Sequence, residues 1–237
     1  MGSHLFEEFV GRLTPLDLQA RGAPSRAAYR ARYLSALRAA TPAERRAVDA
    51  AFDPARLDAA LRRQGLALPR PWPPCVVLAH DADIEGRMPH AMSFRTRRGA
   101  LAAIVVDRRE FAQPDFAKTL HHEYVHVLQQ TFPAPFDAWY RRRWGLVRAG
   151  AARLPPALLA RRRANPDAPH IYVPADQGAP HTTAQADQSA WLVTYVGEPR
   201  SLADCHYERA DGAARPLVLD DEHPHERIAY LMEADFD

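Results

Sequence analysis

The sequence predicts an α+β protein in which helices come first, a small mixed sheet follows, and further helices end the chain. Three observations support this order. Apolar residues recur at helical spacing from about residue 14 to residue 65. A proline-rich segment then interrupts the pattern, and the apolar runs after it are short enough to be strands. Helical spacing returns near residue 115 and again near Pro224.

The N-terminal region is expected to be helical. Tyr29, Tyr33 and Leu37 fall on one stripe of a helix. Thr41 stands where an N-cap residue does, with Pro42 at the first helical position and Glu44 at the third. We expect this region to pack as a cap or an extension on the rest of the protein.

The best candidate for a domain boundary is Pro69–Pro74, which reads Pro-Arg-Pro-Trp-Pro-Pro. It divides the chain into an N-terminal helical region, residues 1–68, and a second domain, residues 69–237.

The second domain begins with short apolar runs that predict the sheet. Cys75–Ala79 is expected to be one strand, and Met92–Arg95 and Ala100–Asp107 are expected to form a hairpin. Helices are predicted over 115–131 and 136–147.

The rest of the chain gives weaker patterns. Residues 150–185 are rich in Pro, Asp and Gln and are expected to be loop. Trp191–Val196 is typical of a strand, and Pro224 suits the first position of a last helix.

Composition excludes several classes of protein. A net charge of +2 on 237 residues gives no reason to expect nucleic acid or an anionic membrane as a partner. No run approaches the ~20 apolar residues that span a bilayer.

The N-terminus lacks a basic segment followed by an apolar one, which predicts a cytoplasmic protein or one exported by a route independent of a signal peptide. With only 2 cysteines, any metal ligands must be His, Asp or Glu.

The segment His122-Glu123-Tyr124-Val125-His126 contains the pattern H-E-x-x-H. On a helix, positions i and i+4 lie about 40° apart and one turn apart, so both imidazoles reach one ion. The glutamate between them stands where it can take a proton from a metal-bound water.

The two histidines are predicted to project from the side of the helix opposite its apolar stripe, which consists of Leu120, Tyr124, Val127 and Leu128. The alternative is a pair of solvent-facing histidines on an amphipathic helix. His121 points elsewhere and is expected at the surface or in support of the ligands.

A catalytic zinc needs a third protein ligand and an open position for water. On the helix that starts at Pro224, Glu226, Tyr230 and Glu233 share one face. We therefore favour Glu226 as the third ligand. The alternatives are His181 and the histidines of the preceding loop, such as His223.

With these residues the chain resembles the gluzincin branch of the zincin metallopeptidases, which combine H-E-x-x-H with a glutamate on a later helix. The family's common N-E-x-x-D is His225-Glu226-Arg227-Ile228-Ala229 here, so another residue must orient the ligand histidine. The resemblance implies a zincin-like fold with an active-site helix, bound Zn²⁺, and a peptide or protein substrate. It also implies that Ala102–Val106 forms the edge of the cleft, where a peptide could add as a strand.

A second resemblance covers His122–Gln130, which reads HEYVHVLQQ. This run is similar to metallopeptidase-type domains attached to bacterial toxin and injection systems, and it implies an effector role.

The expected function is therefore hydrolysis of peptide bonds, with Zn²⁺ held by His122, His126 and Glu226 and with Glu123 as the general base. Candidates for the donor that steadies the oxyanion are Tyr230, His223, Tyr195 and His206. The main alternative is a catalytically inactive module of this fold that binds a partner in a secretion or toxin system. A non-haem iron oxygenase is a more distant alternative.

Overall fold

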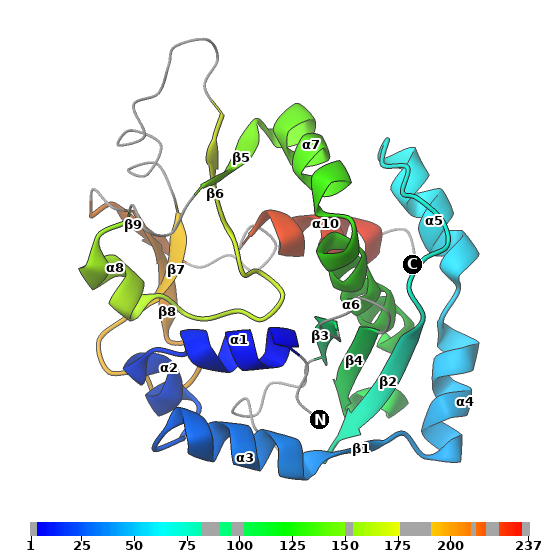
Figure 1. The fold of residues 1–237 in the computed structure, drawn as a ribbon, viewed down its shortest axis with the longest axis horizontal. Helices are drawn as coiled ribbons and strands as arrows, with labels where there is room; N and C mark the ends of the chain where they lie inside the picture. Colours follow the sequence, from blue (N-terminus) through cyan, green and yellow to red (C-terminus); the bar gives the residue numbers. More distant parts are fainter. Residues whose placement is uncertain are drawn as a thin grey trace.

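The computed structural model describes residues 4–81, 91–95, 102–149, 154–175, 191–209, 212–216 and 223–233. It is an α+β protein, as the sequence predicts. Helix α6 (Phe116–Thr131) contacts the four-stranded sheet as well as α10 (Pro224–Glu233), the last helix (Figure 1). Both helices carry predicted site residues.

The N-terminal region is helical except for one short strand. Its elements are α1 (His4–Arg12), α2 (Pro15–Ala20), α3 (Arg26–Ala36), β1 (Leu37–Ala39), α4 (Pro42–Ala51) and α5 (Pro54–Arg63). The predicted start of α4 is confirmed, because Thr41 and Glu44 form a reciprocal capping box. Leu37 does not continue the stripe of Tyr29 and Tyr33. The chain turns extended there, and Leu37 pairs with His80 of the sheet.

The first sheet is mixed, as predicted, and has the order β1-β2-β4-β3. Its other strands are β2 (Cys75–His80), β3 (Ala91–Arg95) and β4 (Ala102–Asp107). β2 and β4 are parallel, whereas β3 pairs with β4 in the antiparallel sense, which confirms the predicted hairpin strands.

This order corrects the expected cleft edge. Ala102–Val106 lies in β4, which has β2 on one side and β3 on the other, so its backbone groups are already paired. Among the described strands of this sheet, β3 and β1 are the outer ones.

The remaining elements are short. They are the 3₁₀ turn η1 (Glu110–Ala112), α7 (Pro133–Trp144), β5 (Leu146–Ala149), α8 (Pro156–Arg161), β6 (Ile171–Pro174), β7 (Leu192–Tyr195), β8 (Cys205–Glu208) and β9 (Ala214–Pro216). β5 pairs with β6, and β7, β8 and β9 form an antiparallel sheet. The strand prediction for Trp191–Val196 and the helix from Pro224 are confirmed.

Two predictions in this region are wrong. The helix predicted over 136–147 ends at Trp144, because Gly145 adopts a left-handed conformation (φ 64°) and the chain then enters β5. Residues 150–185 were expected to be loop, but they contain α8 and β6. Strand β6 is held by pairing with β5, a tertiary contact that has no local sequence signal.

One hydrophobic core contains residues from both sides of the proline-rich segment Pro69–Pro74. Leu57 and Leu61 of α5 pack in the same buried cluster as Trp72, Ile104 and Leu128. The helical region before residue 68 and the site-bearing region after it therefore share hydrophobic contacts as well as a sheet. No helix of the described part of the chain is long and apolar enough to cross a membrane.

A buried carboxylate ties α2 to the distant β7. Asp17 is fully buried, and its Oδ1 accepts hydrogen bonds from Arg21 (2.9 Å), from the Tyr195 hydroxyl (2.9 Å) and from the Ala164 backbone N–H (3.0 Å). Its Oδ2 accepts from the backbone N–H of Thr14. This network holds the N-terminal helices against the C-terminal half.

We predict that Asp17→Ala lowers the free energy of unfolding by about 3–5 kcal/mol, because it removes the carboxylate that compensates the buried charge of Arg21. The measurement is urea denaturation of both proteins. As a control, Glu7→Ala removes the pair between Glu7 and Arg30, whose side chains are 42% and 44% exposed, and should cost less than ~1 kcal/mol. Equal losses in the two variants would contradict this account.

Candidate metal centre

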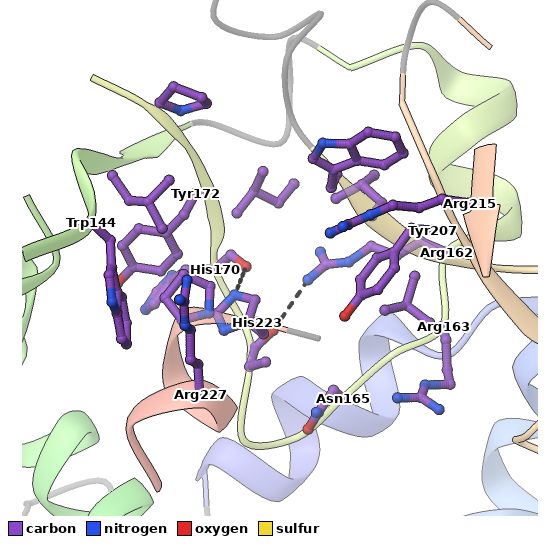
Figure 2. Close-up of a pocket in the computed structure, with 18 residues that line it drawn as sticks. Trp144, Arg162, Arg163, Asn165, His170, Tyr172, Tyr207, Arg215, His223 and Arg227 are labelled. Carbon is purple, nitrogen blue, oxygen red and sulfur yellow. Dashed lines mark hydrogen bonds between the residues drawn. The ribbon is translucent and has the colours of Figure 1, made fainter. Parts of the chain in front are cut away.

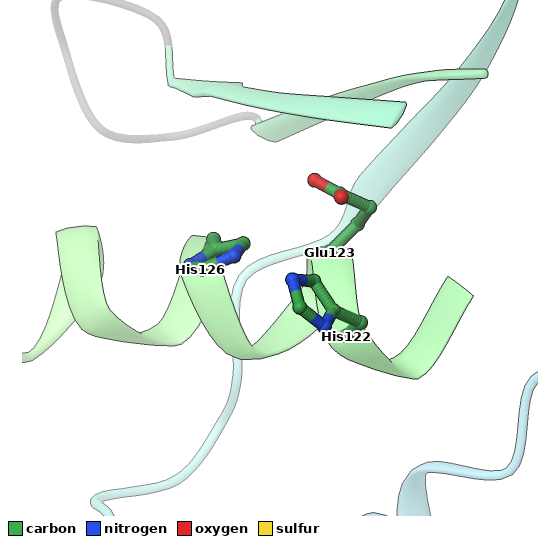
Figure 3. A group of neighbouring side chains, drawn as sticks. All are labelled: His122, Glu123 and His126. Carbon is green, nitrogen blue, oxygen red and sulfur yellow. The ribbon is translucent and has the colours of Figure 1, made fainter. Parts of the chain in front are cut away.

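Helix α6 places His122, Glu123 and His126 together, and all three side chains are buried (8%, 6% and 1% exposed). One ligand atom from each lies within 4.8 Å of the others. In Figure 3 the two imidazoles lie one turn apart on α6, and the Glu123 carboxylate points toward the neighbouring strands. This group could hold a metal ion.

The face that carries these histidines is not open to solvent. Every residue from Leu120 to Gln129 is buried, so α6 is covered all round. The alternative of two solvent-facing histidines is therefore wrong. The histidines do lie away from the apolar stripe, but α10 covers them.

Glu226 meets both histidines. Its Oε2 lies 3.1 Å from Nε2 of His122 and 3.4 Å from Nε2 of His126. Glu226 stands in the first turn of α10, a helix that begins with Pro224, and its side chain is buried. The structure thus brings the predicted third ligand, 104 positions away in sequence, against the motif.

Hydrogen bonds fix the tautomer of His126. The amide nitrogen of Gln129 donates to the backbone carbonyl of His225 (2.9 Å), which can only accept. The Gln129 carbonyl oxygen must therefore face His126 Nδ1, 2.8 Å away, and that nitrogen must carry the proton. The lone pair of the neutral ring then lies on Nε2, the atom that faces Glu226.

The other oxygen of Glu226 is also held. Its Oε1 accepts a hydrogen bond from the side-chain amide of Asn165 (2.8 Å), and the carbonyl oxygen of Asn165 accepts from the backbone N–H of Asp167. These residues lie in the loop between α8 and β6. Their role was not anticipated, because the loop has no motif that marks it.

The ionisation of His126 and that of Glu226 depend on each other. Burial lowers the pKa of His126, but the charge of Glu226 and the hydrogen bond to it outweigh this and raise that pKa to about 9. Burial also opposes the ionisation of Glu226, yet the charges of His126 and His122 and their hydrogen bonds hold its pKa well below the usual range. Without a metal, His126 and Glu226 form an ion pair.

The pKa of Glu123 is shifted in the opposite direction from that of Glu226. Burial and the charge of Asp167 raise the pKa of Glu123 to about 8, although His126 and His122 partly offset this. Its Oε2 is buried and has no hydrogen-bond partner among the described residues. A buried oxygen without a hydrogen-bond partner costs free energy. Such an oxygen therefore indicates a position at which a further polar group would bind.

Tyr230 lies beside the centre. Its ring is 4.9 Å from that of His122, edge to face, and its side chain is half-buried. The face of α10 predicted to carry Glu226 and Tyr230 does point at the histidines. On the opposite side of α10, Ile228 is buried, whereas Leu231 is 38% exposed.

His223 is held elsewhere. Its Nε2 donates to the carbonyl of His170 (2.9 Å), its Nδ1 accepts from the backbone N–H of His225 (3.1 Å), and its ring lies against Tyr172 (Figure 2). With both nitrogens engaged, His223 is poorly placed as a metal ligand or as an oxyanion donor.

The other candidates also lie apart from the motif. Tyr195 belongs to the Asp17 network, and His206 contacts Thr194 and Glu208 in the three-stranded sheet. His181 lies outside the described residues. His121 is buried rather than at the surface, since Nδ1 contacts the Ala117 carbonyl and Nε2 accepts from the backbone N–H of Asp53.

A comparison with protein-family models, with curated proteins and with solved structures found no significant match. The resemblance to zincins therefore rests on the motif and on the geometry of these side chains.

We predict that Gln129→Ala weakens Zn²⁺ binding about 10- to 100-fold, because His126 loses the acceptor that fixes its tautomer and orientation. Competition with a chromogenic chelator measures the affinity. Gln113→Ala, at an exposed glutamine before α6, is the control and should leave the affinity unchanged. An unchanged affinity in Gln129→Ala would show that the amide does not support the site.

Proposed function

We propose that the protein is a zinc-dependent peptidase with a zincin-like site, in which His122, His126 and Glu226 hold Zn²⁺ and Glu123 is the general base. The observation that carries this proposal is the position of Glu226 Oε2, which lies against Nε2 of both histidines. Two histidines and one glutamate, with a fourth position open for water, are a common ligand set of catalytic zinc.

The distances suit side chains that would share one zinc ion. Two atoms that each lie about 2.0–2.1 Å from a tetrahedral zinc are roughly 3.3 Å apart. The separations of 3.1 and 3.4 Å between Glu226 Oε2 and the two Nε2 atoms are close to this value. The lone pair of neutral His126 already lies on Nε2, so a bound metal would replace the proton that the ring shares with Glu226.

The bound ion would supply a water of lowered pKa and polarise the scissile carbonyl. Beside a bound cation the pKa of Glu123 would fall from its value of about 8, so that its carboxylate would take a proton from that water and pass it to the leaving amine. Its position beside the histidines, within 4.8 Å of their ligand atoms, suits this task, and so does an Oε2 that no described residue engages.

Tyr230 is the best placed of the four predicted oxyanion donors. Its ring lies against His122, whereas both nitrogens of His223 are engaged at the start of α10. A hydroxyl aimed at the developing negative charge would stabilise the transition state more than the ground state.

A peptide or protein is the substrate class that the resemblance implies. β3 is an outer strand of the described sheet and contacts α6, so a peptide that adds as a strand would do so there rather than at β4. The effector role follows from HEYVHVLQQ alone and remains a prediction. The location, in the cytoplasm or outside it by a route independent of a signal peptide, is a separate prediction from the N-terminal sequence.

Glu123→Gln should abolish hydrolysis and leave the zinc content unchanged, because it removes the base but no ligand. We expect a loss of at least about 10²-fold in the cleavage rate. The assay is cleavage of a quenched-fluorescent peptide library by the zinc-loaded protein. Glu208→Gln, at another buried glutamate that pairs with Arg161, is the matched control and should keep its activity.

Two outcomes would overturn the proposal. Cleavage by Glu123→Gln at the wild-type rate would exclude this mechanism. A zinc-loaded wild type that cleaves no member of the library would favour the inactive binding module.

A further inference from the structure

A cavity of about 230 Å³ is lined by residues of the loop before β6, of the strands β6 and β7, and of the start of α10. In Figure 2, Trp144 and Arg227 lie at one end of it, and Arg162, Arg215 and Tyr207 at the other. The volume is below the ~300–1,000 Å³ of sites for drug-sized ligands, so it suits a small molecule or one side chain.

The charge of the lining has one sign. Arg162, Arg163, Arg215 and Arg227 line the cavity, and no Asp or Glu does so among the residues that the structure describes. Such a concave surface of one sign concentrates ions of the opposite sign.

Arg162 makes few polar contacts for a charged side chain. Within the described part of the chain, its guanidinium makes one hydrogen bond, from Nη2 to the carbonyl of Ala168 (3.2 Å). A guanidinium has five N–H donors in a planar fork that matches a carboxylate or a phosphate. Burial and the charge of Arg12 lower the pKa of Arg162 to about 10, and the charge of Asp17 offsets this only in part.

Aromatic rings complete the lining. The guanidinium of Arg227 lies 4.7 Å from the ring centre of Trp144, and that of Arg215 lies 4.9 Å from Trp191 and 4.6 Å from Tyr207. This stacking holds the cations in place before any ligand arrives, which lowers the entropy cost of binding. The rings also offer apolar surface to the rest of a ligand.

We propose that this cavity is an anion-binding site for a carboxylate or phosphate group attached to an apolar or aromatic moiety, with Arg162 as its main contact. The site is distinct from the metal centre and does not depend on zinc. It adjoins that centre, because Asn165 lines the cavity and also donates to Glu226.

The test is binding of phenyl phosphate and of N-acetylphenylalanine to the full chain in the presence of a chelator, measured by tryptophan fluorescence and by calorimetry. The first probe represents a small aromatic phosphate and the second a peptide's terminal carboxylate, and their relative affinities distinguish these sources. N-acetylphenylalaninamide is the neutral control. We expect at least one anion to bind at least about tenfold more tightly than the amide, because only an anion compensates the buried guanidinium.

Arg162→Gln should weaken anion binding at least about tenfold. Arg143→Gln, which removes the same charge from an exposed position outside the cavity, should leave it unchanged. Arg215→Gln, at an exposed position on the cavity rim, should also weaken binding and serves if Arg162→Gln does not fold. The proposal is wrong if the amide binds as tightly as both anions, if neither anion binds at millimolar concentration, or if Arg143→Gln has the effect expected of Arg162→Gln.

Discussion

The contact between Glu226 and the two histidines of α6 is the interaction on which the candidate centre depends. It joins helices that are far apart in sequence through three ionisable side chains, all of them buried. Taking such groups out of water is costly unless each has a partner. Asn165 and Gln129 supply the remaining partners, and they fix the Glu226 carboxylate and the His126 ring. A buried cluster of this kind is a strong candidate for function, because a core built for stability alone gains little from it.

The contact between Glu226 and His126 is compatible with both a metal-free and a metal-bound protein. Without a metal, the proton on His126 neutralises Glu226, so the pair is stable in the folded protein. A metal ion held by these residues would take the place of that proton, and the ligand atoms would need little movement. Glu123 is the member of the group that this pairing leaves unsatisfied, since its Oε2 has no partner in the described part of the chain. A bound water is a partner of the right chemistry.

The sequence predicts those features that depend on residues close together in the chain. The spacing of His122 and His126, the capping box at Thr41 and the strands β2 and β4 are all set within a few residues, and the structure has them where they were predicted. Gln129 was overlooked, although its position three residues after His126 places it on the same helix face. Asn165 had no signal at all, since its place beside Glu226 arises from packing of a loop against α10. Strand order was not predictable for the same reason, and β4 proved to be an inner strand.

Elemental analysis of the purified protein, after incubation with zinc and removal of excess metal, tests the central claim most directly. The proposed site predicts about one zinc per chain in the wild type and almost none in His122→Ala or Glu226→Ala, because a catalytic site of this kind has three protein ligands. If Glu226→Ala retained its zinc, Glu226 would not be a ligand, and the contact between α6 and α10 would not belong to the metal site. A wild type that takes up no zinc would contradict the whole account.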